Sequence, residues 1–481
     1  MATKYLKSRN QELEIPEKNP FANDKLDRLH IASVLTDIVS FYGQSGCVMA
    51  LDGEWGAGKT TFVKMWAQHL KNTGFKTLYF NAWTTDYSDD ALMAIVSELK
   101  ELSPQDDNTC NKIATGAARI LLSVGKGMFK KMTGVNSEEI DAILSESSDI
   151  GKEYLKEYAT KKTTIEEFKH EVTEYVAYNA AEHPIVFFID ELDRCNPHYA
   201  VSVLERVKHL FDIPNIIFVL AINKIQLCNA IQGYFGSTNI DSNEYLRRFI
   251  DIEYTLPAPK LEAYCEYLYN EYGFDDFFQD SQRLQYFRSS SEADLFKKLA
   301  RMMFELFHSN LRQIERIYAY ARLALMQFYP NTYLVPDVYF LLCFWKITNP
   351  PFYLSIRNKE YTPQELLTEL EKILPHSCFN QAESIYMDRY LLYTIAGFIY
   401  CYDITDVVNQ RPSQPSISAT EVNGKLIYPL KSEYLNKDGF NEALNYYYTQ
   451  YSESRSNGLS YIFNRIDLLE SCLLYTSPSP R

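Results

Sequence analysis

The residues with the clearest chemical meaning form the stretch Gly53-Glu-Trp-Gly-Ala-Gly-Lys-Thr60, which fits the pattern G-x-x-x-x-G-K-[ST]. Glycines in this pattern let backbone N–H groups turn inward around phosphates, and a following helix adds the positive end of its dipole. Lys59 would reach the β- and γ-phosphates of a nucleoside triphosphate, and the Thr60 hydroxyl would bind Mg²⁺. A chance match is the alternative, and a strand before the loop with a helix after it argues against chance. The residues expected to hold the nucleotide are Gly53, Trp55, Gly56, Ala57, Gly58, Lys59, Thr60 and Thr61.

Two acids, Asp190 and Glu191, directly follow the most apolar run of the chain, residues 184–189. An acid at the carboxyl end of a strand, in the sheet that carries a phosphate loop, is placed to hold Mg²⁺ through water. A second carboxylate after it can orient and activate a water molecule for attack on the γ-phosphorus. Alone this pattern is weak, because a strand that ends at a polar turn would also produce it. Combined with the phosphate loop, it predicts Asp190 as a metal ligand and Glu191 as a catalytic base.

Asn223 follows the next apolar run and has two open interpretations. It could orient the attacking water beside the γ-phosphate, or it could be an ordinary turn asparagine. The sequence Asn223-Lys-Ile-Gln226 also approaches the guanine-reading pattern Asn-Lys-x-Asp. The single amide oxygen of Gln226 is a poor acceptor for the two N–H groups of guanine, so ATP is expected rather than GTP.

Several arginines are candidates for neutralising the charge that develops on the transferred phosphate, an effect worth several powers of ten in rate. Arg312 and the pair Arg247-Arg248 are the expected candidates, acting in the same chain or from a neighbouring subunit. Most arginines are surface residues with no such role. Arg194 could equally pair with Asp193 and do nothing else.

The elements around these residues predict an α/β fold. Apolar runs at 47–51, 75–80, 184–189 and 216–222 read as buried strands, and helical patterns at 26–41, 60–71 and 199–211 alternate with them. Strands that are continuously apolar imply a parallel sheet with helices on both faces. We therefore expect a P-loop core over residues 21–256, with a helical insertion at about 100–170.

Pro257-Ala-Pro259 marks the expected end of this core. A helical, lid-like region at 257–330 and a helical, aromatic-rich region at 331–471 are expected to follow. Residues 1–20 look like a polar lead-in, and residues 137–156 are charged and serine-rich enough to form a mobile arm. Residues 472–481 resemble a translated adaptor sequence and are excluded from the expected fold.

Composition narrows the classes of function. The net charge of −14 gives no support for nucleic-acid binding. No run of about 18 apolar residues is present for a membrane helix, and the polar N-terminus lacks a signal-peptide pattern, so a cytoplasmic protein is expected. The nine cysteines are scattered, as in a reducing compartment. Neither a zinc-type histidine pair nor a G-x-S-x-G motif occurs, which leaves zinc and serine hydrolases without support.

Together these motifs resemble the KAP family of P-loop NTPases over about residues 21–330. The resemblance rests on Phe21-Ala-Asn-Asp24 with Arg28, on Trp55 in the phosphate loop, on Phe80-Asn-Ala-Trp83, and on Ile189-Asp-Glu-Leu-Asp-Arg194. It implies a core of the additional-strand class with the second acid as base, although the family commonly has Asp-Asp where this chain has Asp-Glu. Many members carry membrane helices between the loop and the acidic strand, whereas the insertion here has none. Bacterial members are associated with phage exclusion, which makes defence a hypothesis for this chain.

Three readings follow from these observations. The leading one is a Mg²⁺-dependent ATPase that acts as a switch, whose helical regions respond to the γ-phosphate and whose partner is a second copy or another protein. The second is a non-catalytic scaffold in which ATP binding only sets an assembly state. The third, a small-molecule kinase, needs an acceptor pocket for which the sequence offers no residues.

Overall fold

The computed structural model describes residues 14–88, 90–103, 107–132, 148–286, 291–375, 385–406, 411–422, 424–451 and 458–467. Contacts divide the chain into two compact units, one of them Glu12–Pro259 and the other beginning at Lys260. The division falls at the Pro257-Ala-Pro259 segment, while the other expected boundaries stay predictions. The suspected adaptor sequence at 472–481 lies outside the described residues.

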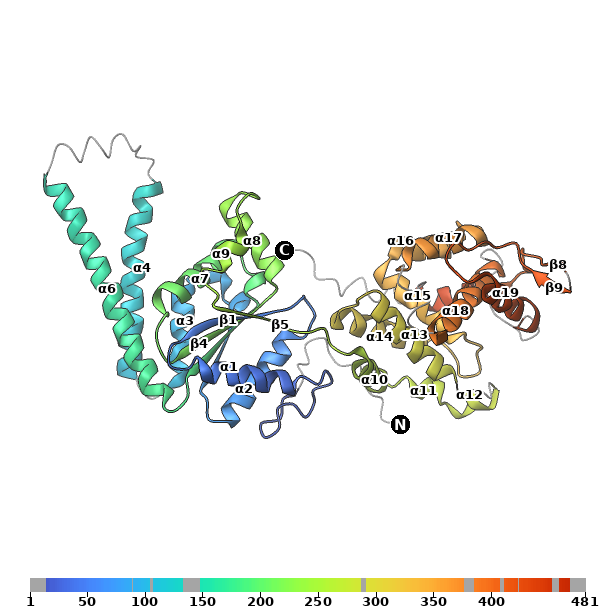
Figure 1. The fold of residues 1–481 in the computed structure, drawn as a ribbon, viewed down its shortest axis with the longest axis horizontal. Helices are drawn as coiled ribbons and strands as arrows, with labels where there is room; N and C mark the ends of the chain where they lie inside the picture. Colours follow the sequence, from blue (N-terminus) through green and yellow to red (C-terminus); the bar gives the residue numbers. More distant parts are fainter. Residues whose placement is uncertain are drawn as a thin grey trace. The chain divides into compact units, whose positions relative to one another are not determined.

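A five-stranded parallel sheet forms the centre of the first unit (Figure 1). Its order is β2-β3-β4-β1-β5, so β4 separates the strand before the phosphate loop from the strand before the two acids. The strands are β1 (Cys47–Asp52), β2 (Thr77–Asn81), β3 (Ile185–Asp190), β4 (Ile216–Ile222) and β5 (Ile252–Thr255). The expected α/β fold with a parallel sheet is confirmed, and β5 is the strand that the sequence analysis missed.

The sheet is covered on both faces because its strands are apolar at nearly every position. Alternate side chains of each strand enter two different clusters, so that Phe187 packs on one face and Phe188 on the other. One face is covered by α1 (Leu29–Phe41) and α2 (Lys59–Asn72). The other is covered by α3 (Ala91–Leu99), α4 (Asp107–Met132), α6 (Ser148–Ala180), α7 (Pro197–Leu210), α8 (Lys224–Phe235) and α9 (Ser242–Leu246).

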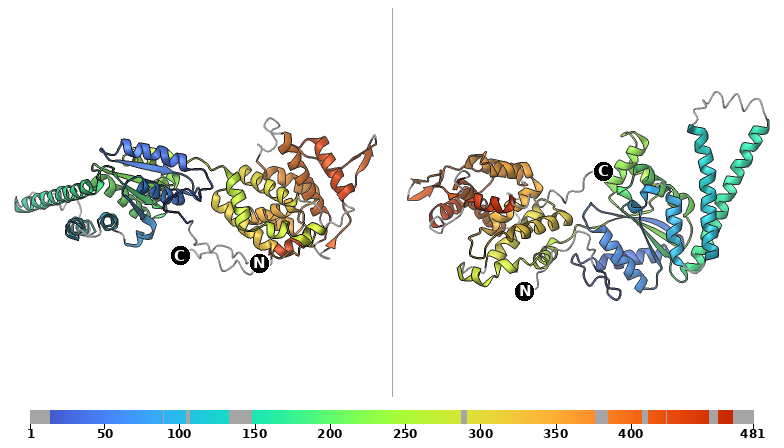
Figure 2. Two further views of the ribbon diagram at one scale, coloured as in Figure 1. Left: turned by 90° about the horizontal axis from the view of Figure 1, so that it is seen from below. Right: turned by 180° about the vertical axis from the view of Figure 1, so that it is seen from behind.

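The insertion between the loop and the acids is a pair of helices, α4 and α6, that contact each other and extend beyond the edge of the sheet (Figures 1 and 2). Their bases join the core through Tyr175, whose hydroxyl donates to the Leu99 carbonyl. The expected mobile arm at 137–156 is only partly testable, since 137–147 lies outside the described residues. Residues 148–156 belong to α6, and the expected mobility of this segment stays a prediction.

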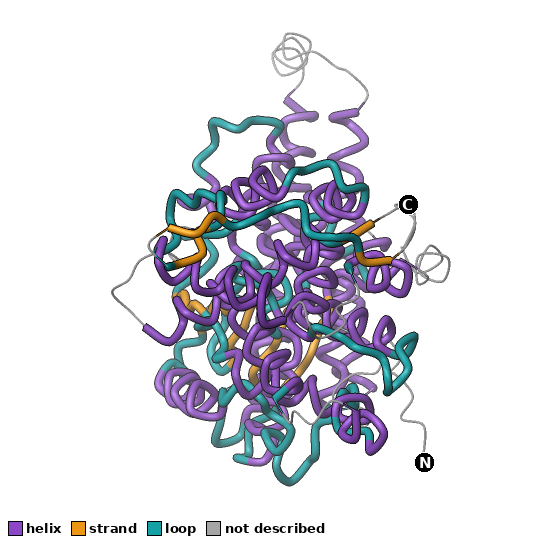
Figure 3. The backbone as a smooth tube through the Cα atoms, turned by 90° about the vertical axis from the view of Figure 1, so that its right-hand side faces the viewer, coloured by secondary structure: helices purple, strands orange, loops and turns teal. Residues whose placement is uncertain are grey.

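The second unit is mainly helical, as expected, and helices dominate the tube drawing of both units (Figure 3). Aromatic side chains fill one continuous core there, including the fully buried Tyr318, Tyr339 and Phe340. Its larger helices are α10 (Leu261–Glu271), α13 (Glu292–Leu306), α14 (Leu311–Leu325), α15 (Pro336–Thr348), α16 (Pro350–Arg357), α17 (Pro363–Ile373), α18 (Ile385–Asp403), α19 (Lys437–Asn445) and α20 (Leu459–Asp467). Two short antiparallel strand pairs are also present, β6 (Thr405–Asp406) with β7 (Arg411–Pro412) and β8 (Thr420–Val422) with β9 (Lys425–Ile427).

Candidate nucleotide-binding site

The loop between β1 and α2 has the backbone of a phosphate cradle. Gly56 and Gly58 have φ angles of 80° and 79°, in the left-handed region that other residues avoid. Gly58 is also the N-cap residue of α2, and no side chain caps this helix start. Asp90, Asn196 and Asn223, by contrast, cap α3, α7 and α8 with their side chains. The first N–H groups of α2 are therefore left for a ligand, and an anion fits that position.

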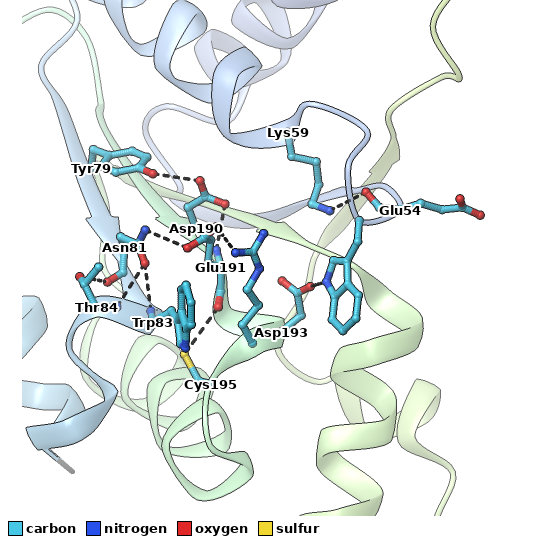
Figure 4. Close-up of polar contacts among 12 residues, drawn as sticks. Glu54, Lys59, Tyr79, Asn81, Trp83, Thr84, Asp190, Glu191, Asp193 and Cys195 are labelled. Atoms are coloured by element: carbon cyan, nitrogen blue, oxygen red, sulfur yellow. Dashed lines mark hydrogen bonds and ion pairs between the residues drawn. The ribbon is translucent and has the colours of Figure 1, made fainter. Parts of the chain in front are cut away.

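Lys59 lies inside the loop and is almost fully buried. Its Nζ donates to the carbonyl of Gly53 at 2.6 Å. It also donates to the carbonyl of Glu54 at 3.1 Å (Figure 4). Burial lowers the pKa of Lys59, and the nearby carboxylates of Asp193, Asp190 and Asp52 oppose that shift. A buried ammonium held mainly by neutral carbonyls is a favourable site for a phosphate oxygen, which offers it a full negative charge.

Asp190 ends β3 with only 1% of its surface exposed. Its carboxylate accepts hydrogen bonds from Thr60, from the Tyr79 hydroxyl at 2.9 Å and from the Glu191 N–H at 2.8 Å. Burial raises the pKa of Asp190, and the bonds from Thr60 and Tyr79 oppose the shift. The structure thus brings the expected metal-binding pair, Thr60 and Asp190, into contact. A hydroxyl beside one carboxylate suits Mg²⁺, which completes its shell with water and phosphate oxygens.

Glu191 is held from two sides. Its Oε2 accepts from the Asn81 amide at 3.0 Å, and its Oε1 pairs with Arg194 Nη1 at 2.7 Å. The backbone of Glu191 is left-handed, with φ of 60°, which is unusual for a residue with a side chain. Asn81 reaches it because β2 and β3 pair in parallel with Asn81 opposite Asp190. The possible Arg194–Asp193 pair of the sequence analysis is wrong, since Arg194 turns back to Glu191 instead.

Two tryptophans of the family pattern lie beside these charges. The Trp55 indole N–H donates to the Asp193 carboxylate, which links the phosphate loop to the turn after β3 (Figure 4). Trp83 is 51% exposed, and the Arg194 guanidinium lies over its ring at 5.5 Å from the centroid. These pairings and the role of Tyr79 were not predicted from the sequence, although Asn81, Trp83 and Asp193 all belong to the motifs that carry the resemblance.

The other expected residues lie in different settings. Asn223 ends β4 and caps α8, its side-chain oxygen accepting from the Gln226 N–H at 3.2 Å. Arg247 is exposed and pairs with Glu244 at 3.0 Å, and no described contact links it or Arg248 to the phosphate loop. Arg312 is an exposed residue of α14 in the second unit. Roles for these residues in the reaction stay predictions.

Arg28 is a further buried cation beside the loop. Only 3% of its surface is exposed, and its Nη1 donates to the Gly58 carbonyl at 3.4 Å. Its Nη2 is buried with no hydrogen-bond partner among the described residues. The Asp24 carboxylate already accepts from the backbone N–H groups of Leu26 and Arg28. Burial lowers the pKa of Arg28 to about 10, opposed by Asp24.

Two kinds of feature are absent from the described part of the chain. No helix there has the length and apolar character that crossing a membrane requires. No cluster of three or more His, Cys, Asp or Glu side chains suited to a metal occurs within the described ranges. The second result leaves room for a Mg²⁺ ion of the kind discussed above, because such an ion takes few ligands from the protein.

Comparison with known proteins gives one strong match. The profile of the KAP family P-loop domain matches residues 28–324, which is more than half of the chain. No curated protein matches the sequence. Among solved structures, the chain is similar to the ORC2 protein of Aeropyrum pernix in ADPNP–ADP complexes, with 15% identity, coverage of 89% of this chain and 95% of that one, and a TM-score of 0.30. It is also similar to Drosophila ORC bound to DNA, with 11% identity, coverage of 92% and 85%, and a TM-score of 0.34.

Proposed function

The chain belongs to the KAP family of P-loop NTPases, and from this premise we propose that it binds ATP with Mg²⁺ and hydrolyses it as a nucleotide-driven switch. One observation carries the proposal. Lys59, at the start of α2, lies near Asp190 and Glu191 at the end of β3 (Figure 4). Thr60, the next residue of α2, forms a hydrogen bond with Asp190. Four side chains from two distant segments therefore supply a phosphate cation, a metal-binding pair and a base.

Each residue has a distinct part in the proposed reaction. The N–H groups at the start of α2 and the Lys59 ammonium hold the β- and γ-phosphates. Mg²⁺, held by Thr60 and Asp190, would neutralise phosphate charge as the bond to the leaving group breaks. Glu191 orients a water molecule and takes its proton. The water oxygen bonds to the γ-phosphorus, the bond from that phosphorus to the β–γ bridging oxygen breaks, and ADP and phosphate leave.

The proposal is tested by steady-state phosphate release and by ATP binding, each measured on wild type, Lys59→Ala and Glu191→Gln. Lys59→Ala should bind ATP poorly, because it removes the cation that meets the phosphates. Glu191→Gln should bind ATP normally and stall, because an amide cannot take the proton. If both variants release phosphate as fast as the wild type, hydrolysis at this site is wrong.

The non-catalytic scaffold has one observation in its favour. The Glu191 carboxylate is engaged by both Asn81 and Arg194, so a water-activating role requires it to lose a partner. ATP binding without turnover, together with a change in molecular size on ATP addition, would favour the scaffold. We propose a second copy or another protein as the partner that reads the nucleotide state. A role in phage defence rests on the family resemblance and is tested by plaque counts with and without an intact Lys59.

A further inference from the structure

The charged side chains of the site raise the question of which cation meets the γ-phosphate besides Lys59. Arg194 is in direct contact with the second acid, through its 2.7 Å pair with Glu191. Asp190, the residue before Glu191, accepts a hydrogen bond from Thr60, the residue after Lys59. Both cations therefore lie next to Asp190 and Glu191.

Local backbone geometry fixes the direction of Arg194. After the left-handed Glu191 the chain enters a short 3-10 turn, Leu192–Arg194, in which the Arg194 N–H donates to the Glu191 carbonyl at 3.1 Å. The spacing of three residues places the arginine side chain back over Glu191. The Arg194 guanidinium lies over the ring of Trp83, and 26% of the arginine side chain is exposed. The Arg194 side chain is therefore directed towards Glu191 and is still partly exposed to solvent.

The pair with Glu191 is one that a phosphate can replace. A guanidinium has several N–H donors in a fixed plane and binds phosphate oxygens in the same forked way as carboxylate oxygens. A triphosphate at the phosphate loop brings more negative charge than one carboxylate. When Arg194 turns to it, Glu191 keeps its bond to Asn81 and gains a free oxygen for water.

We propose that Arg194 is the arginine, supplied by the same chain, that binds the γ-phosphate, and that it leaves Glu191 to do so. This inference rests on the proposed ATPase function and adds regulation to it. Without a nucleotide, Arg194 is paired with Glu191, the proposed catalytic base. With a nucleotide, the same movement frees the base and stabilises the phosphate charge. Arg247 and Arg312 are not needed for this role, and Arg247 already has an exposed partner.

The first test separates binding from the chemical step. Arg194→Ala should lower kcat by about a thousandfold or more, which is the range seen when a phosphate-binding arginine is lost. The dissociation constant for a non-hydrolysable ATP analogue should change less than tenfold, because Lys59 and the loop remain. Binding of ADP with aluminium fluoride, which mimics the phosphate in transit, should be lost. Arg301→Ala, which removes an exposed, ion-paired arginine of the second unit, is the matched control and should behave as wild type.

The second test follows Trp83 rather than turnover. Two of the four tryptophans, Trp66 and Trp345, are fully buried, so nucleotide-dependent fluorescence is expected from Trp55 and Trp83. Adding Mg²⁺ and a non-hydrolysable ATP analogue should change the emission, and Trp83→Phe should remove part of that change. Arg194→Ala should remove the same part, because the moving guanidinium is gone. A Trp83 signal that persists in Arg194→Ala would overturn the proposal.

The outcomes distinguish the inference from the function beneath it. If wild type and Lys59→Ala release equal phosphate, the ATPase proposal fails. If Lys59→Ala and Glu191→Gln lose activity but Arg194→Ala keeps it or gains rate, only the role of Arg194 is overturned. Arg194→Lys keeps a charge without the fork and should fall between wild type and Arg194→Ala, which keeps the test usable if the alanine variant does not fold. A rate for Arg194→Lys equal to that of wild type would contradict the forked contact.

Discussion

Buried charges are treated differently in the two units. In the second unit, Arg283 makes two bonds to Glu292, at 2.6 and 2.8 Å, and two more to backbone carbonyls. Lys359 likewise donates to three carbonyls, at 2.6 to 2.9 Å. In the first unit, Arg28 has a buried nitrogen without a hydrogen-bond partner among the described residues. Burial opposes the charge in both units, at Lys59 and Asp190 as at Lys359 and Glu292.

This difference indicates which unit is the better candidate for binding a charged ligand. A buried ion that is fully bonded within the protein stabilises one structure and needs nothing else. A buried ion with unmet bonds costs free energy until something charged arrives, and several such ions close together mark a functional site. This criterion favours the first unit as the place of the proposed ligand site. The charges of Arg283, Glu292 and Lys359 in the second unit are bonded within the protein, and Asp337 is an exception there.

The largest predicted effect is on the second unit. Arg283→Met should cost about 3–5 kcal/mol of stability, because it leaves Glu292 buried without its cation. Calorimetric unfolding of the full chain, with hydrogen exchange to locate the loss near α13, measures it. The double variant Arg283→Met, Glu292→Leu should recover most of the loss. A loss of stability below about 1 kcal/mol for Arg283→Met would contradict a structural role for the buried pair of Arg283 and Glu292.

The exception in the second unit is Asp337, a fully buried acid that lies near Tyr390, Cys401 and Tyr447. Burial raises the pKa of Asp337 to about 6 from an ordinary 3.8. The contribution of a raised pKa to folding is fully present below the ordinary value of 3.8 and is lost as the pH rises through about 6. Asp337→Asn should therefore stabilise the chain by about 2–3 kcal/mol at neutral pH.

The gain from Asp337→Asn should shrink as the pH falls from 7.5 toward 4, because the wild-type acid then becomes neutral as well. Melting temperatures of both proteins across this range provide the measurement. A gain that is the same at every pH would show that the charge of Asp337 is not its cause.

A smaller effect is expected in the phosphate loop. Gly58→Ala places a side chain at a φ of 79°, which should cost about 1–2 kcal/mol and weaken ATP binding. Gly53→Ala is the matched control for stability, since Gly53 is absent from the left-handed region and its added carbon would meet Lys59 at an ordinary 3.5 Å. Chemical denaturation without nucleotide compares the two. An equal cost at both positions would contradict a strained cradle at Gly58.

The smallest effect on stability is expected for a substitution of Arg28, the buried cation beside the phosphate loop. Arg28→Met should change the stability of the ligand-free chain by no more than about 1 kcal/mol, because the cation it removes is poorly bonded. Mg²⁺ and ATP should also stabilise Arg28→Met less than they stabilise the wild type. The same change at Arg283 is far more costly, so the two methionine variants form a pair. A loss at Arg28 as large as that at Arg283 would contradict the account.

Much of the first unit could be predicted because its signals are local. The strands β1, β3 and β4 are continuous apolar runs, and the loop and both acids lie directly at strand ends. The short edge strand β5 was missed because its side chains alternate in burial and its four residues give little pattern.

The pairing of Glu191 could not be predicted in the same way. Its contact with Asn81 joins residues 110 positions apart and depends on the register of β2 against β3. Its contact with Arg194 depends on the left-handed backbone of Glu191, which the sequence does not reveal. Proximity along the chain suggested Asp193 as the partner of Arg194, but the indole of Trp55 takes that carboxylate.

The most direct measurement of the central claim follows the oxygen of the attacking water. Wild-type protein is given Mg²⁺ and ATP in ¹⁸O-labelled water, and the products are analysed by mass spectrometry. The account predicts one heavy oxygen in the released phosphate, none in ADP, and ATP retained intact on Glu191→Gln. Absence of labelled phosphate from the wild type, or equal labelling by Glu191→Gln, would contradict it.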